Sequence, residues 1–322
     1  MFKKTNTLKT HLLQRLIAAF FIFGLLFHGL NVSVQAVSSD RQHAATQLVP
    51  LSYQLNAVAP QELAAFYEDR IGLTLLEEEG EYYRLGTPAG TTLLEIFPAE
   101  FIKTELTSGL YHTAFLMEDR VLLGSAVAHL LEQKVPLQGF SHHTVSEAAY
   151  LADPEGNGIE LYSDTSMTTW RYDNEGYIEM GNAPLDITSL LLLREPYDGF
   201  TDSTSIGHFH LSVNDIAASE DFYQVLMGFG ATTALDEQTA FFASGDYHHY
   251  LGTNNWASAD APHPRDGEQG LRAVIWQTAA PNDLDYIVNQ LEKRNYPYEQ
   301  TEEGLSFQDT SGITHIVRLL TE

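Results

Sequence analysis

The chain repeats itself at a fixed distance, and this repeat constrains the fold more than any other feature of the sequence. Residues 66–73 (FYEDRIGL) recur as residues 222–229 (FYQVLMGF). Residues 153–156 (DPEG) recur as residues 309–312 (DTSG), at the same offset of 156 residues. A repeat of this kind indicates that the two halves of the chain contain the same structural units.

Each half divides further into two units. A short strand with alternating apolar residues opens each unit, at 51–58, 109–117, 206–213 and 270–278. A helical segment and three short strand-like runs follow each opening, which gives units of about 50 residues. One such unit cannot cover both faces of its own sheet, so the units must pair. We therefore predict an α+β fold of four tandem βαβββ modules, paired into two open, barrel-like mixed sheets with the helices outside.

The metal-binding chemistry open to the chain is limited by its composition. Cysteine is absent, so a metal could be held only by His, Asp or Glu. His112 and His208 stand at the same place in the second and third units, each seven residues before an aspartate. Glu160 lies between two apolar residues on the last strand of the second unit, where a buried carboxylate is costly unless it is paired or binds a metal. We predict that these three form a 2-His-1-carboxylate set, which suits Fe(II).

The remaining units indicate how the modules pair. Where the ligands would stand, the first unit has Ser52 and the fourth has Ala273 and Ile316. This favours pairing of the second unit with the third around the metal and of the first with the fourth. The alternative pairs the first unit with the second and uses Glu95, His112 and Glu160, which leaves His208 without a role.

Several motifs carry a family resemblance. The opening GHFHLSVND (207–215), the FYxxxxG helix ends and the strand DPEGNGIELY (153–162) resemble the vicinal oxygen chelate superfamily, which includes glyoxalases, bleomycin resistance proteins and dioxygenases. Within it the chain is similar to two-domain catechol 2,3-dioxygenases, the type I extradiol enzymes. The resemblance implies a first domain at 51–165, a connecting segment at 166–204 and a second domain at 205–322. Familiar extradiol enzymes take their ligands from the last two units, so the set predicted here departs from them.

The same resemblance implies further site residues. Tyr150 stands ten residues before the predicted carboxylate ligand, where extradiol enzymes carry an active-site tyrosine. Strand alternation places Tyr150 and Glu160 on facing neighbouring strands across the DPEGNG turn. His249 resembles the acid-base histidine of the family. If the segment is a strand, only one of His248 and His249 faces the metal, and we choose His249 as catalytic. We assign His210, His143 and His248 to substrate binding.

Together these features predict an Fe(II)-dependent extradiol dioxygenase that cleaves a catechol-like aromatic diol with O2. Two alternatives use the same scaffold. A glyoxalase-like isomerase or hydrolase would use Mn, Zn or Ni in place of iron, and a small-molecule binding or resistance protein would keep only the cavity. The sequence leaves a homo-oligomer open.

Charge and the N-terminus bear on partners and location. With 43 acidic and 17 basic residues, the formal charge is -26, which argues against nucleic acid as a partner. Four basic residues precede the apolar run 16–27, and V-Q-A follows at 34–36. This pattern predicts a secretory signal cleaved near Ala36, with a polar linker at 37–50. The alternative is an uncleaved N-terminal membrane anchor.

Overall fold

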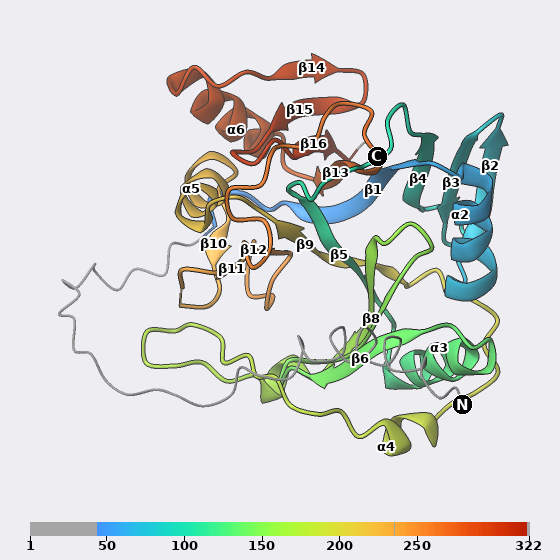
Figure 1. Cartoon of the computed structure of the whole chain (residues 1–322). Helices are drawn as coiled ribbons and strands as arrows, with labels where there is room; N and C mark the ends of the chain where they lie inside the picture. Colours follow the sequence, from blue (N-terminus) through green and yellow to red (C-terminus); the bar gives the residue numbers. More distant parts are fainter. Residues whose placement is uncertain (1–43, 235, 321–322) are drawn as a thin grey trace, which may run out of the picture. The chain divides into compact units, whose positions relative to one another are not determined.

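The computed structural model describes residues 44–234 and 236–320, and within them the strands form two eight-stranded mixed sheets (Figure 1). The first sheet has the order β14-β15-β16-β13-β1-β4-β3-β2, with bounds Glu299–Thr301 (β14), Gly304–Gln308 (β15), Thr314–Leu319 (β16), Gly270–Thr278 (β13), Val49–Ala57 (β1), Thr92–Pro98 (β4), Tyr82–Gly86 (β3) and Thr74–Glu79 (β2). The second has the order β10-β11-β12-β9-β5-β8-β7-β6, with bounds Gly230–Ala231 (β10), Thr239–Ala243 (β11), Leu251–Asn254 (β12), Ser205–Ser212 (β9), Gly109–Leu116 (β5), Gly158–Asp164 (β8), Ser146–Ala152 (β7) and Leu137–His142 (β6).

One helical segment follows the first strand of each module and packs on the strands of that module (Figure 1). The segments are Pro60–Phe66 (α2) continued by the π-helical turn Tyr67–Ile71 (η1), Arg120–Glu132 (α3), Ile216–Asp221 (α5) continued by the π-helical turn Phe222–Leu226 (η3), and Pro281–Lys293 (α6). Two short helices, Met167–Thr169 (η2) and Ile187–Leu191 (α4), lie in the segment that joins the halves. The order strand, helix, three strands confirms the predicted fold class.

Residues noted in the sequence begin or end several of these helices. Asp119 and Asp215, the aspartates seven residues after the predicted histidine ligands, are N-caps whose carboxylates accept from backbone N–H groups of the first turn. The FYxxxxG motif forms a π-helical turn followed by glycine, and Gly72 takes the left-handed conformation (φ 99°) that glycine tolerates. The motif therefore specifies how these two helical segments end.

Each sheet combines modules from both halves of the chain. β5 of the second module pairs antiparallel with β9 of the third, and β1 of the first pairs antiparallel with β13 of the fourth. The predicted pairing of two with three and one with four is confirmed, and the alternative pairing of one with two is wrong. The domain boundaries at residues 165 and 205 stay predictions.

The hydrophobic core lies where one face of each sheet meets the other. Tyr53 on β1 contacts Phe115 and Phe209 of the second sheet, with ring centroids 6.3 Å apart in both cases. Phe209 also packs edge-on against Trp276 of β13 at 5.4 Å. Because successive strand residues alternate between faces, the neighbours of these aromatic residues, including His208, point away from the core. This leaves the other face of each sheet for polar side chains.

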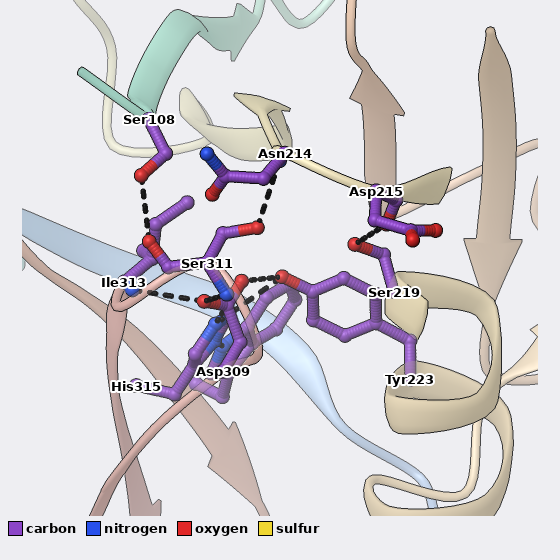
Figure 2. A network of polar contacts seen from close by, with 10 residues as sticks. Ser108, Asn214, Asp215, Ser219, Tyr223, Asp309, Ser311, Ile313 and His315 are labelled. Carbon is purple, nitrogen blue, oxygen red and sulfur yellow. Dashed lines mark hydrogen bonds and ion pairs between the residues drawn. The ribbon is translucent and has the colours of Figure 1, made fainter. Parts of the chain in front are cut away.

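Two buried tyrosine–aspartate hydrogen bonds join modules that belong to different sheets. Tyr67 of the first module donates to Asp153 of the second (3.1 Å), and Tyr223 of the third donates to Asp309 of the fourth (2.5 Å). Figure 2 shows the second pair, in which Asp309 also accepts from the backbone of the turn that it begins. The sheets thus join the two halves of the chain, and the tyrosine–aspartate hydrogen bonds join the two modules within each half.

No helix in the part of the chain described here is both long and apolar enough to cross a bilayer. The predicted signal or anchor at 1–36 falls outside the described residues.

Candidate metal centre

Three buried side chains meet on the polar face of the second sheet. They are His112 of β5, Glu160 of β8 and His208 of β9, and their ligand atoms all lie within 4.8 Å of one another. His112 Nε2 lies 3.0 Å and His208 Nε2 3.3 Å from Glu160 Oε2. These are the three residues for which the sequence predicted a metal-binding role.

Strand register explains why they meet. Ala114 of β5 is opposite His208 on one side and Glu160 on the other, so the three positions form a row across adjacent strands. His112 lies two residues before Ala114 and therefore on the same face. The small side chain of Ala114 leaves room for the imidazole and the carboxylate to approach each other.

The donor set fits a divalent metal ion. His112 Nε2 is buried and has no hydrogen-bond partner among the described residues, although it lies beside the carboxylate. A buried polar atom without a partner is costly, and a metal bound by all three groups would satisfy it. Two imidazoles with one carboxylate match the oxygen and nitrogen ligand sets of iron, manganese, nickel and zinc sites.

Electrostatics favour the protonation states that bind metals. Burial acts to raise the pKa of Glu160, but His208 and His112 beside its carboxylate outweigh this effect and hold that pKa well below its usual range. Burial lowers the pKa of His208 to about 4, although Glu160 opposes the shift. At neutral pH the site therefore offers an ionised carboxylate and a neutral His208 imidazole, which are the forms that coordinate metal.

Tyr150 lies opposite Glu160 in the register of β7 and β8, as strand alternation predicted. Its ring centroid is 5.8 Å from that of His112. The phenol donates to His143 Nε2 (2.7 Å), because His143 Nδ1 faces the carbonyl of Gly181 (2.9 Å) and must carry the ring hydrogen. Burial and the charge of Glu160 raise the pKa of Tyr150 well above its usual value. The phenol oxygen is thus held protonated beside the cluster.

The remaining histidines assigned from sequence also lie near the cluster. The rings of His210 and His112 are 4.9 Å apart, and those of His249 and His208 are 4.1 Å apart. His248 is fully buried and lies further from His208, at 6.2 Å. Burial lowers the pKa of His210 and of His249 well below the usual histidine value, so both are neutral at neutral pH.

The assumption that His248 and His249 lie on a strand was wrong. Both are in the loop between β11 and β12, which follows a turn at Gly245 (φ 69°). The alternation of strand residues therefore does not separate them. Instead their Nδ1 atoms are hydrogen-bonded to each other at 2.8 Å, and His248 Nε2 is 3.0 Å from Asp164 Oδ1.

Several aromatic residues beside the cluster were not singled out from the sequence. The ladder of β5 and β9 is irregular at Tyr111, and this bulge places its ring 5.3 Å from that of its neighbour His112. Trp256 contacts Tyr111 at 5.4 Å and His210 at 5.9 Å, and Phe241 contacts His210 at 5.8 Å. With Trp256 52% exposed and His210 5% exposed, this aromatic group runs from the surface to the buried cluster.

Asp164 was also missed, although a signal for it exists. It lies four residues after Glu160 on β8, and even spacing on a strand places both side chains on one face. Its second oxygen accepts from Tyr247 (2.9 Å), which is hydrogen-bonded to Tyr162 of the same strand (2.7 Å). Asp164 is therefore held by two side chains of the loop that carries His249.

Comparison with known proteins agrees with this fold. The family model for the Glyoxalase/Bleomycin resistance protein/Dioxygenase superfamily matches residues 50–161 and 205–314. A catechol-2,3-dioxygenase from Bacillus subtilis (strain 168) is 35% identical over 250 residues, which cover 76% of this chain and 87% of that protein.

Solved structures show the same fold at lower identity. A candidate dioxygenase from Bacillus subtilis subsp. subtilis str. 168 superposes with a TM-score of 0.55 at 15% identity, covering 85% of this chain and 86% of that one. Glyoxalase I from Zea mays superposes with a TM-score of 0.51 at 12% identity, covering 84% and 92%. From the matched modules and the 35% identical relative, we conclude that this chain belongs to the Glyoxalase/Bleomycin resistance protein/Dioxygenase superfamily.

Proposed function

We propose that this protein is an Fe(II)-dependent extradiol dioxygenase that cleaves a catechol-like aromatic diol with O2. The observation that carries the proposal is the buried cluster of His112, Glu160 and His208. Two histidines and one carboxylate form a donor set that would hold Fe(II), and iron held there would supply the chemistry of O2 with a bound diol. The similarity to a catechol-2,3-dioxygenase supports this choice among the chemistries of the superfamily.

In this mechanism His112, Glu160 and His208 would hold the iron, which supplies the redox chemistry when bound. The surrounding residues bind the ring and manage protons. Tyr150 presents its phenol oxygen beside the cluster, where it would hydrogen-bond a substrate hydroxyl. His249, a neutral imidazole next to His208, would exchange a proton with the diol.

The aromatic group beside the cluster suits a flat substrate. Tyr111, Phe241 and Trp256 offer ring faces and edges to an aromatic diol, and such contacts contribute about 0.5–1.5 kcal/mol each beyond area burial. An aromatic substrate explains the presence of these rings better than a small aliphatic one would.

The direct test is aerobic turnover. Protein reconstituted with Fe(II) is expected to turn yellow on addition of catechol and to consume one O2 per ring cleaved, measured by absorbance and an oxygen electrode. Protein loaded with Zn(II) serves as the control and should do neither, because zinc has no redox chemistry. Failure of the iron protein across catechol and its alkyl- and chloro-substituted forms would contradict the proposal and favour a glyoxalase-like reaction or simple binding.

We also propose that the protein is exported. The support is the N-terminal pattern alone, four basic residues and an apolar run followed by V-Q-A at 34–36. N-terminal sequencing of the mature protein should give Val37 as the first residue. A chain that retains its first 36 residues in the membrane fraction would instead indicate an anchor.

A further inference from the structure

A chain of hydrogen bonds leads from Asp164 to His249, whose ring lies beside the metal cluster. Asp164 Oδ1 is 3.0 Å from His248 Nε2, and His248 Nδ1 is 2.8 Å from His249 Nδ1. The His249 ring in turn lies 4.1 Å from that of His208. The mechanism above gives Asp164 and His248 no role. Both are thus connected to His249, which has one.

The chemistry of the donors and acceptors determines where the hydrogens lie. An ionised carboxylate only accepts, so His248 Nε2 must carry the hydrogen in its bond to Asp164. A neutral imidazole has a single N–H, and Nδ1 of His248 is then an acceptor. The hydrogen between the two rings therefore belongs to His249 Nδ1. This leaves Nε2 of His249 without a hydrogen.

The opposite arrangement would require a cation at His248. If His248 carried hydrogens on both nitrogens, it would donate to His249, and Nε2 of His249 would become a donor. His248 has no exposed surface, and a buried cation is costly. Asp164 would face that cation, but its other oxygen already accepts from Tyr247 (2.9 Å). The neutral pair is the arrangement that the contacts favour.

We propose that Asp164 and His248 are positioning residues that hold His249 in the tautomer with hydrogen on Nδ1, so that Nε2 is a proton acceptor for the bound diol. The role of His249 Nε2 as a proton acceptor rests on the proposed function, but the assignment of the tautomer does not. The arrangement also restrains the loop between β11 and β12, because Asp164 on β8 binds both His248 and Tyr247 of that loop.

The tautomer can be measured directly. Full-length protein labelled with ¹⁵N in histidine and loaded with diamagnetic Zn(II) is suited to long-range ¹H–¹⁵N correlation spectra, in which protonated and bare ring nitrogens resonate far apart. Spectra of His248→Gln and His249→Gln assign the signals. We expect a hydrogen on Nε2 of His248 and on Nδ1 of His249. A hydrogen on Nε2 of His249 in the unmodified protein would overturn the proposal.

Substitutions at Asp164 separate positioning from general support of the fold. Asp164→Leu removes the acceptor and should shift both histidines to a mixture of tautomers. Asp164→Asn keeps an acceptor oxygen and should preserve the tautomers. Asp246→Leu, at an exposed carboxylate of the same loop, is the matched control and should change neither histidine. Unchanged tautomers in a folded Asp164→Leu variant would contradict the proposal.

Kinetics with Fe(II)-loaded protein provide a second readout. Asp164→Leu should lower kcat for catechol by about 10- to 100-fold while KM stays within about threefold, because orientation of the acceptor is lost and ring binding is not. Asp164→Asn should recover most of the loss. Absence of turnover in the unmodified protein and in every variant would contradict the proposed function. The spectra would still decide the tautomer, so failure of the proposed function can be distinguished from failure of the proposed tautomer.

Discussion

Glu160→Gln is expected to abolish stable metal binding. The substitution keeps the size of the side chain but removes the only carboxylate of the cluster, and with it the charge that balances a divalent ion between His112 and His208. Loss of an outer hydrogen-bond partner of a metal ligand alone typically costs 10- to 100-fold in affinity, so loss of the ligand charge should exceed about 100-fold. Equilibrium dialysis followed by elemental analysis measures the effect.

The matched control is Glu95→Gln. Glu95 is the corresponding acid on the last strand of the first module, where Gln54 (3.1 Å) and Tyr82 (2.8 Å) donate to its carboxylate. This variant should bind metal as the unmodified protein does. Retention of metal by Glu160→Gln together with its loss in Glu95→Gln would place the ion in the first sheet and overturn the assignment.

Asp309→Ala is expected to destabilise the fold by about 3–5 kcal/mol, the range for breaking a buried, hydrogen-bonded charge. Asp309 is 3% exposed and accepts from Tyr223 and from the backbone N–H groups of Ser311 and Ile313 (Figure 2). His315 lies 3.7 Å from the same carboxylate and accepts from Trp276 at its other nitrogen (3.0 Å). Removal of the carboxylate leaves three buried donors without their acceptor.

Urea unfolding followed by circular dichroism measures this loss, and the melting temperature should fall by about 10 °C. Asp173→Ala is the matched control. Asp173 also accepts from two backbone N–H groups of its own turn, but it is exposed, so water can replace it. Its removal should cost less than about 1 kcal/mol. Equal losses in the two variants would show that the buried network contributes nothing of its own.

The arrangement of the modules could be predicted because the positions of the candidate ligands favoured one pairing. Ser52, Ala273 and Ile316 cannot bind a metal as histidine or glutamate would, so only the second and third modules together supply two histidines and a carboxylate. Strand alternation then placed Tyr150 opposite Glu160, which the register confirms. These predictions needed residue type and a period of two, both of which a single sequence contains.

The parts that could not be predicted depend on departures from regular strands. A bulge turns Tyr111 toward the cluster, and nothing in the local sequence distinguishes it from its neighbours. A turn at Gly245 takes His248 and His249 out of the strand, so both can belong to one hydrogen-bonded chain. Asp164 enters that chain across a contact between distant segments. Such contacts arise from the tertiary fold rather than from local pattern.

The pairing of modules across the two halves has a consequence for synthesis and for descent. A ribosome that has completed the first half has delivered His112 and Glu160, but the site cannot close until β9 brings His208 and aligns beside β5. In a half-length ancestor of this repeat, a second copy of the chain would therefore have had to supply the third ligand. Duplication of the half-length sequence and fusion of the two copies would have placed all three ligands in one chain.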